Sequence, residues 1–486
     1  MKTDFFQEPL LEFGVDKHVD IKFGLMNYGP LDFQMSTAPK NIKLGIIGTH
    51  ESIEGVQEWI EKCRIGIPAK ISRRPNLFPR FPGFSTNSRL CADFIFDNQL
   101  FRIIPEKNFQ IYCDLPKTEK TSIAIANLFL EEMEYLTQKT TVDVLVCAYP
   151  FCLVKYLAQE EDVSLLDDES ERGQILQPIA SSFVFHDYLK AKAMMYKKPT
   201  QIIRPSTYDD SKRLKRNHPS GEYRQIQDEA TRAWNLYIAL YYKSGGTPWR
   251  LIREWSQLST CYIGVSFYKS TDEKVLLTST AQVFNERGEG VILRGGSGQI
   301  SKDDRQIHLS SENAYALLKN ALSNYHREHK NYPARVVVHK SSIHNRDEII
   351  GFDQALKECS IDRDAADFVS ITRSFTRLFR QNIYPPLRGT YFDPGGSIYI
   401  LYTKGSVDFY NTYPGLYIPL PLGFRCDRTS QTPKYIAKEI LGLTKMNWNN
   451  AQFDGGEPIT LRAARQVGSI LKYLDDIYEP YYRYYM

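Results

Sequence analysis

The sequence predicts an α/β protein with two folded units, and three observations support this class. The first half alternates short apolar runs with segments of helical spacing, which is typical of a parallel, Rossmann-like sheet. The second half places three β-rich runs before a helix, a further strand and another helix, the element order of a ribonuclease-H-like unit. At 486 residues, the chain is also too long for one ordinary core.

The first half supplies the predicted parallel strands. The apolar run 41–49 precedes a helical pattern at 50–63, and further strands are predicted at 142–150 and 199–207. A long amphipathic helix then ends at Lys243, immediately before Ser-Gly-Gly. Taken alone, Lys243 is explained by a structural role, because a cation at a helix C-terminus complements the helix dipole.

The second half contains the predicted meander at 261–270, 274–284 and 290–296, followed by a helix, a strand at 334–342 and another helix. A nuclease of this class needs carboxylates on its first strand and near the end of its fourth, where they hold two divalent metal ions. Neither "YIGVSFY" nor "VVVHKSS" contains an acid, and "PITLRAARQVGSILKY" (458–473) contains no Asp, Glu or His. The sequence therefore predicts that this chemistry is missing.

Charge, cysteine spacing and apolar runs limit the classes of function that the chain can have. The net charge of +4 is too small to indicate a nucleic-acid partner, although bases cluster at 72–80, 211–218 and 373–381 and acids at 159–172. Each cluster fits a solvated face as well as a binding surface. The eight cysteines show no zinc spacing, and no apolar run is long enough to span a bilayer. We expect a cytoplasmic protein without a membrane partner.

Several motifs together carry a family resemblance. The stretches "YKSGGTPW", "CYIGVSFY", "ARVVVHKSSIHNRDEIIGF" and "PITLRAARQVG" resemble the PIWI domain of a prokaryotic Argonaute. The opening "LEFG…GLMNYGPLD…IKLGIIGT" resembles the entry to the MID domain of short members of that family. The resemblance implies an entry segment at 1–40, a Rossmann-like MID domain at 41–245 and a ribonuclease-H-like PIWI domain at 246–486, with no room for N-terminal and PAZ domains.

The resemblance also implies a pocket for the 5′-phosphate of a guide strand. The matching positions hold His186, Lys190, Gln201 and Lys243, whose ammonium, imidazole and amide groups suit phosphate oxygens. Eukaryotic members carry a further lysine where this chain has Ala239. In prokaryotic relatives a Mg²⁺ ion joins the pocket, which here would involve Gln201 and the terminal carboxylate of Met486. The aromatic tail that ends in Met486 fits simple packing equally well.

The catalytic positions of the family fall at Ser266, near Ser341 and near Arg465. Serine has no charge to hold Mg²⁺, so the resemblance implies a chain that is not an enzyme. It further implies guide-RNA-directed recognition of single-stranded target DNA without cleavage. The partner would be a separate APAZ-containing effector, either a sirtuin-like or a TIR NADase with the sirtuin-like type preferred, acting in abortive defence against plasmids or phage.

Two other functions stay open at this stage. The chain could be a guide-directed nuclease whose metal site is rebuilt from other acids, such as Glu286, Glu289 or Asp393. It could instead be a general single-strand or nucleotide-binding protein. Indifference to a guide's 5′-phosphate would favour this last function.

Overall fold

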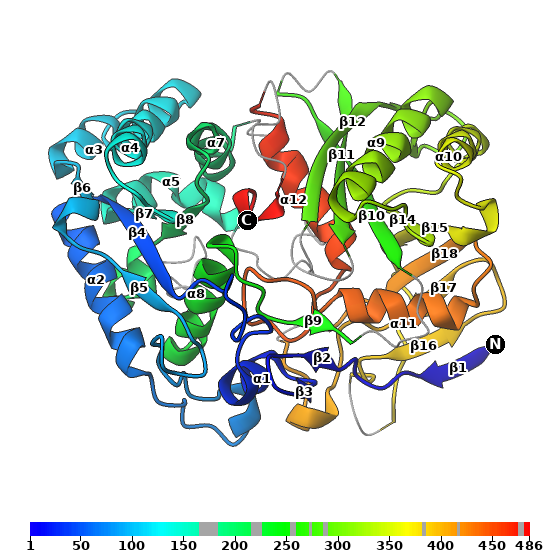
Figure 1. Ribbon diagram of the computed structural model, residues 1–486, viewed down its shortest axis with the longest axis horizontal. Coiled ribbons are helices and arrows are strands. Elements are labelled where there is room, and N and C mark those ends of the chain that lie inside the picture. The colour runs from blue at the N-terminus through cyan, green and yellow to red at the C-terminus, as the bar shows by residue number, and fades with distance from the viewer. Residues whose placement is uncertain are drawn as a thin grey trace. The chain divides into compact units, whose positions relative to one another are not determined.

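The computed structural model describes residues 1–164, 183–214, 226–252, 259–271, 275–284, 290–381, 385–415, 418–474 and 481–486. The chain forms two compact units (Figure 1). The Rossmann-like unit consists of Glu12–Trp249 with Trp448–Ala451. The ribonuclease-H-like unit consists of Met1–Leu11, Arg250–Asn447 and Gln452–Met486.

The Rossmann-like unit is built on a parallel sheet. Its strand order is β5-β4-β7-β8, and β6 pairs with the same strand β4 as β5 does. The strands are β4 (Asn41–Gly48), β5 (Asp93–Ile95), β6 (Phe101–Ile103), β7 (Val144–Ala148) and β8 (Thr200–Ile203). Every pairing among the described strands of this sheet is parallel, and β5 and β6 continue one another along the same edge of β4.

Helices cover both faces of this parallel sheet. Side chains alternate between the faces of a strand, so Gly45 and Gly48 of β4 face opposite sides. A side chain at Gly45 would meet Leu136 of α4 (Glu119–Lys139), whereas one at Gly48 would meet Ser52 of α2 (His50–Ile65). The other helices are α1 (Ile21–Tyr28), α3 (Glu106–Cys113), α5 (Phe151–Ser164), α7 (Phe185–Ala193) and α8 (Glu229–Lys243).

The ribonuclease-H-like unit contains a ten-stranded sheet of order β1-β16-β17-β18-β15-β14-β10-β11-β12-β13. The predicted meander is present as β10 (Thr260–Lys269), β11 (Leu276–Phe284) and β12 (Gly290–Ile300), and β14 (Arg335–Lys340) runs parallel to β10. No pattern in the sequence predicted the far half of the sheet. It comprises β15 (Ala366–Arg373), β16 (Thr390–Asp393), β17 (Tyr399–Leu401), β18 (Leu422–Arg428) and β1 (Lys2–Phe5), and β13 (Ile307–Leu309) closes the other edge.

Helices cover both faces here as well. Ile263 and Val265 of β10 join one core cluster with α9 (Ser311–His329) and α10 (Arg346–Glu358). The alternate residue Gly264 faces α12 (Ile459–Leu471), whose Thr460 carbonyl would clash with any side chain there. A further helix, α11 (Pro433–Leu443), follows β18. Within the described residues, no helix combines the length and apolarity that crossing a membrane requires.

Buried charges explain why the first residues of the chain belong to the ribonuclease-H-like unit. Glu8 accepts hydrogen bonds from Arg388 at 2.9 Å and pairs with Lys445 at 3.0 Å, and both cationic side chains are fully buried. Residues 1–40 are therefore divided after Leu11, within the short strand β2 (Leu11–Glu12). The short strands β3 (Lys17–His18) and β9 (Arg250–Leu251) pair with β2 in a small separate sheet.

Candidate functional site

The strongest candidate site lies in the Rossmann-like unit, where three of the predicted phosphate ligands meet. Lys190 lies in α7, Gln201 is the second residue of β8, and Lys243 is the last residue of α8. The helix α8 ends there because Gly245 adopts a φ of +100°, and its N–H donates back to the Tyr242 carbonyl at 2.9 Å. The Gly-Gly pair thus fixes where the Lys243 side chain leaves the helix.

Lys243 is buried beside a neutral acceptor. Its Nζ donates to the Gln201 Oε1 atom at 2.6 Å, and the residue is 2% exposed. Burial holds the pKa of Lys243 well below its usual value, and the nearby charge of Lys190 lowers that pKa further. No carboxylate in the described part of the chain forms an ion pair with Lys243. The ammonium is therefore desolvated without a neutralising charge.

Lys190 is buried like Lys243, whereas the His186 side chain is 43% exposed. Burial lowers the pKa of Lys190 to about 8, with a partial offset from Asp187. Burial, followed by the Lys190 charge, also lowers the pKa of His186, whose Nδ1 lies 2.9 Å from the Asp187 Oδ1 atom. The Lys243 ammonium, with a neutral acceptor and the like charge of Lys190 nearby, favours an anion beside it, because a charge-assisted hydrogen bond would relieve its desolvation cost. Ala239, at the position of the further lysine, is buried.

The predicted Mg²⁺ ion has one of its predicted ligands at this site. The Gln201 Oε1 atom already accepts a hydrogen bond from the Lys243 ammonium, so a divalent cation there would share that oxygen with a positive charge. The second predicted ligand, the carboxylate of Met486, belongs to the ribonuclease-H-like unit. In the described ranges, no group of three or more His, Cys, Asp or Glu side chains could hold a metal ion. The Mg²⁺ ion therefore stays a prediction.

Asp32 is a residue of this site that the sequence analysis missed. Its carboxylate accepts a hydrogen bond from the Tyr241 hydroxyl at 2.6 Å and another from the Thr247 N–H at 2.8 Å. These two donors flank the Gly-Gly turn, so Asp32 ties the last turn of α8 to the chain that follows it. Burial raises the pKa of this carboxyl group, and the two donors partly oppose that shift.

The structure places two of the three positions predicted to match the family's catalytic acids, Ser266 and Ser341, on neighbouring strands of the ribonuclease-H-like unit. Val265 pairs with Lys340 in the β10–β14 ladder, and the Ser341 N–H donates to the Val265 carbonyl at 3.2 Å. Ser266 and Ser341 are consequently neighbours at the carboxyl ends of two parallel strands. Ser266 lies on the face of β10 that α12 covers, because it is two residues from Gly264. Arg465 of α12 forms an ion pair with Glu457.

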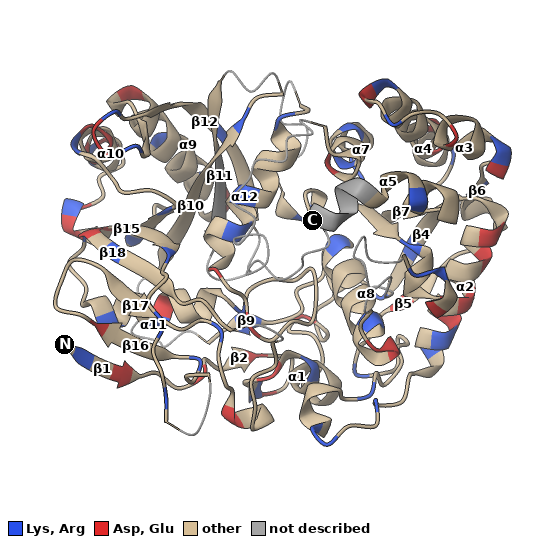
Figure 2. Cartoon of the chain, turned by 180° about the vertical axis from the view of Figure 1, so that it is seen from behind, with Lys and Arg blue, Asp and Glu red and all other residues tan. Residues whose placement is uncertain are grey.

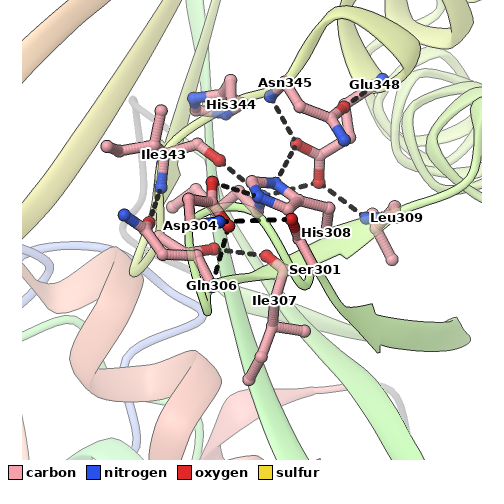
Figure 3. A network of polar contacts seen from close by, with 12 residues as sticks. Ser301, Asp304, Gln306, Ile307, His308, Leu309, Ile343, His344, Asn345 and Glu348 are labelled. Carbon is pink, nitrogen blue, oxygen red and sulfur yellow. Dashed lines mark hydrogen bonds and ion pairs between the residues drawn. The ribbon is translucent and has the colours of Figure 1, made fainter.

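The carboxylate that follows these strands is already engaged. Glu348 pairs with Lys340 at 2.6 Å, and both side chains are fully buried. The remaining lone pairs of Glu348 accept the Leu309 N–H at 2.8 Å and the Asn345 N–H at 2.9 Å. Figure 3 shows the Asn345 and Leu309 contacts converging on this carboxylate. A carboxylate held by an ammonium and two amides has no capacity left for a metal ion.

The same network continues to the β12–β13 connection. His308 lies between two carboxylates, with Nε2 2.8 Å from Asp304 and Nδ1 3.4 Å from Glu348 (Figure 3). Of the acids that could have rebuilt a metal site, Glu286 and Glu289 lie outside the described residues. Asp393 caps a turn by accepting the Gly395 N–H at 2.8 Å, and four strands separate its strand β16 from β10.

Solved structures of known proteins share this architecture. No protein-family model and no curated protein matches the chain. An Argonaute of Clostridium butyricum, solved with a guide DNA bearing a 5′ deoxycytidine and a 19-mer target DNA, aligns with a TM-score of 0.64 and 15% identity. That alignment covers 97% of this chain and 53% of the Argonaute.

Drosophila Piwi aligns with a TM-score of 0.56 and 11% identity, over 99% of this chain and 56% of Piwi. The chain thus spans about half the length of these two proteins. The alignments confirm the predicted fold class, an α/β architecture with a Rossmann-like MID unit and a ribonuclease-H-like PIWI unit. At these identities they concern the fold, and the fold of this chain is Argonaute-like.

Proposed function

We propose that this chain binds the 5′-phosphate of a guide RNA and uses the guide to recognise complementary single-stranded DNA without cutting it. The observation that carries the proposal is the pair of buried ammonium groups of Lys190 and Lys243, one of which has only a neutral amide as its partner. A terminal phosphate supplies both the missing charge and the acceptor oxygens. The Argonaute-like fold supports a nucleic-acid ligand, and the choice of RNA rests on the family resemblance.

The absence of cleavage is part of the proposal. Serines stand at two of the former metal positions, a cationic Arg465 stands near the third, and Lys340 neutralises Glu348. Two-metal catalysis needs carboxylates at these places. Function would then pass to a separate APAZ-linked NADase effector, sirtuin-like by preference or TIR, that responds to target capture during defence against plasmids or phage in the cytoplasm.

The binding step is tested with guides that differ only at the 5′ end. We expect the wild-type protein to prefer a 5′-phosphorylated RNA over the same RNA with a 5′-hydroxyl, and the Lys243→Ala variant to lose that preference. Equal affinity for the two guides would favour the alternative of a general single-strand-binding protein. Comparing RNA and DNA guides of one sequence tests the choice of nucleic acid.

The cleavage step is tested with a labelled complementary DNA in Mg²⁺ and in Mn²⁺. We expect the target to stay intact with the wild-type protein and with the Ser266→Asp, Ser341→Asp double variant, because the third position remains cationic. Target cutting by the wild-type protein would contradict the proposal and support a non-standard metal site. NAD⁺ consumption after co-purification with an effector and addition of target DNA tests the partner.

A further inference from the structure

A basic loop follows α2 in the Rossmann-like unit. Residues 63–92 contain six Lys and Arg residues and no Asp or Glu. In Figure 2 the cationic residues are coloured blue, and they mark the chain beyond the end of α2. Four of these cations, Lys70, Arg73, Arg74 and Arg80, lie within residues 66–83, which we call the basic loop. A run of one sign on a chain of mixed charge indicates an anionic partner.

The basic loop is closed at its base. Gly66 and Gly83 adopt φ values of +108° and +82°, where a side chain would be strained. Between them, the Ile67 N–H donates to the Phe81 carbonyl and the Phe81 N–H donates to the Ile67 carbonyl, both at 2.9 Å. The two ends are thereby held together, and the residues between them project as a compact loop.

Contacts along the loop hold its middle in place. The buried Lys22 of α1 donates to the Leu77 carbonyl at 3.2 Å, and the Trp234 indole of α8 donates to the Arg80 carbonyl at 3.2 Å. The Phe81 ring meets the Trp234 ring edge-on at 4.9 Å. Prolines at positions 68, 75, 79 and 82 restrict the backbone further. The loop therefore presents its cations with little further ordering cost on binding.

The cations of the loop are exposed, and in the described ranges no carboxylate forms an ion pair with them. The contrast with the loop base is informative, because Arg64 pairs there with Glu61 at 3.0 Å and also with Asp93. Lys70 lies over the Phe78 ring at 4.8 Å, which leaves its charge available to solvent. Four like charges without counter-charges repel one another, and a polyanion would neutralise them.

We infer that the cations of the basic loop form a second contact for a nucleic-acid backbone, separate from the 5′-phosphate site. Trp234 holds the loop, and Lys243 lies nine residues further along α8, which corresponds to about 13 Å of helix. The loop is thus anchored at a different point of α8 from the 5′-phosphate site, and we expect only a ligand longer than a mononucleotide to reach both. The inference rests on the proposed function, because it assigns the loop to a strand whose 5′ end occupies that site.

The test compares two variants with the same change in net charge. One carries K70E, R73E and R74E in the loop. The control carries K107E, K120E and K139E, which replace exposed lysines of α3 and α4. The probes are a nucleoside 5′-monophosphate and 5′-phosphorylated and 5′-hydroxyl RNAs of about 20 nucleotides, measured over a series of salt concentrations. Circular dichroism verifies that both variants fold.

We expect the loop variant to bind the long phosphorylated RNA about tenfold more weakly, with a slope of log K against log salt that is lower by about 2. Its affinity for the monophosphate should equal that of the wild type. An unchanged affinity and salt slope for the long RNA would overturn the inference, as would an equal loss in the control variant or a loss of monophosphate binding. If the wild-type protein binds the 5′-phosphorylated and 5′-hydroxyl RNAs with equal affinity, the proposed function fails. In that case, the loop contact would still be supported if the loop variant, and not the control variant, bound the 5′-hydroxyl RNA more weakly than the wild type.

Discussion

Lys243 and Lys340 are two buried lysines that differ in the group that accepts their hydrogen bonds. Lys340, which is fully buried, pairs with the Glu348 carboxylate at 2.6 Å. Lys243, which is 2% exposed, donates at the same distance to the Gln201 amide. Burial lowers the pKa of both lysines, and only for Lys340 does a carboxylate oppose that effect. The first site is electrostatically complete, whereas the second still lacks an anion.

This difference distinguishes a buried charge that stabilises the fold from a buried charge that suits a ligand. A buried charge is tolerated when a partner of opposite sign and further hydrogen bonds satisfy it, and it then holds elements together. A buried charge without such a partner lowers stability and is retained where a ligand supplies the missing charge. In the ribonuclease-H-like unit Lys340 neutralises the buried Glu348 carboxylate, whereas in the Rossmann-like unit Lys243 donates to a neutral amide, which is the observation behind the proposed phosphate ligand.

Removing the carboxylate from the completed pair should have the largest effect. We expect Glu348→Gln to lower the free energy of unfolding by about 3–5 kcal/mol, because it leaves the Lys340 ammonium buried without its counter-charge. Urea unfolding followed by circular dichroism measures this loss. The control is Glu358→Gln, which alters an exposed contact with Tyr315 and Lys319 and should unfold at nearly the wild-type urea concentration.

A double variant sharpens the same prediction. Replacing both partners, in Lys340→Met with Glu348→Gln, should recover most of the lost stability, since no ammonium remains buried and the glutamine oxygen still accepts a backbone N–H. If Glu348→Gln unfolds at the wild-type urea concentration, the pair is not the buried counter-charge that the comparison requires.

Removing the incomplete charge should produce the opposite pattern. We expect Lys243→Met to weaken binding of a 5′-phosphorylated guide by about 1–3 kcal/mol, because a charge-assisted contact is lost. The same change should leave the unfolding free energy of the ligand-free protein equal or higher, since it removes a desolvated ammonium. Fluorescence anisotropy and urea unfolding measure the two quantities. A Lys243→Met variant that is less stable than the wild type and still prefers a 5′-phosphorylated guide would contradict the contrast between Lys243 and Lys340.

The sequence was sufficient for the elements whose pattern is local. The apolar run 41–49 became β4, the Gly-Gly turn ended α8 at Lys243, and the three β-rich runs formed an antiparallel meander. The far half of the large sheet was missed because β16 and β17 are short and β1 comes from the other end of the chain. No local period signals a strand that pairs across nearly four hundred positions.

The site residues that the sequence did not predict have partners that are distant in the sequence. Asp32 meets Tyr241 across 209 positions, and no spacing rule connects them. The role of Lys340 depends on Glu348 being inside the fold. Glu348 also takes part in a capping box with Asn345, a contact between near neighbours, whereas its hydrogen bond from the Leu309 N–H comes from a distant strand.

The comparison also predicts opposite pH dependences for binding and stability. The pKa of Lys190 is about 8 in the folded protein and near 10.5 when the group is solvated. Between these values the unfolded state binds more protons, so the unfolding free energy of the ligand-free protein should rise with pH in that window. Affinity for a 5′-phosphate should instead fall as pH rises through about 8, because the cation is lost. Lys190→Met should abolish both the pH dependence of the unfolding free energy in this window and the fall of affinity above about pH 8.

Asp32 should have the smallest effect, because it acts on the site through the end of α8. Asp32→Ala removes the acceptor for Tyr241 and for the Thr247 N–H, which frees the turn that sets the position of Lys243. We expect the preference for a 5′-phosphate to fall severalfold, and Asp32→Asn to restore most of it, because its amide oxygen still accepts the backbone N–H. Tyr241→Phe keeps the backbone bond and serves as the matched control. If all three variants discriminate the 5′-phosphate like the wild type, the position of Lys243 does not depend on this carboxylate.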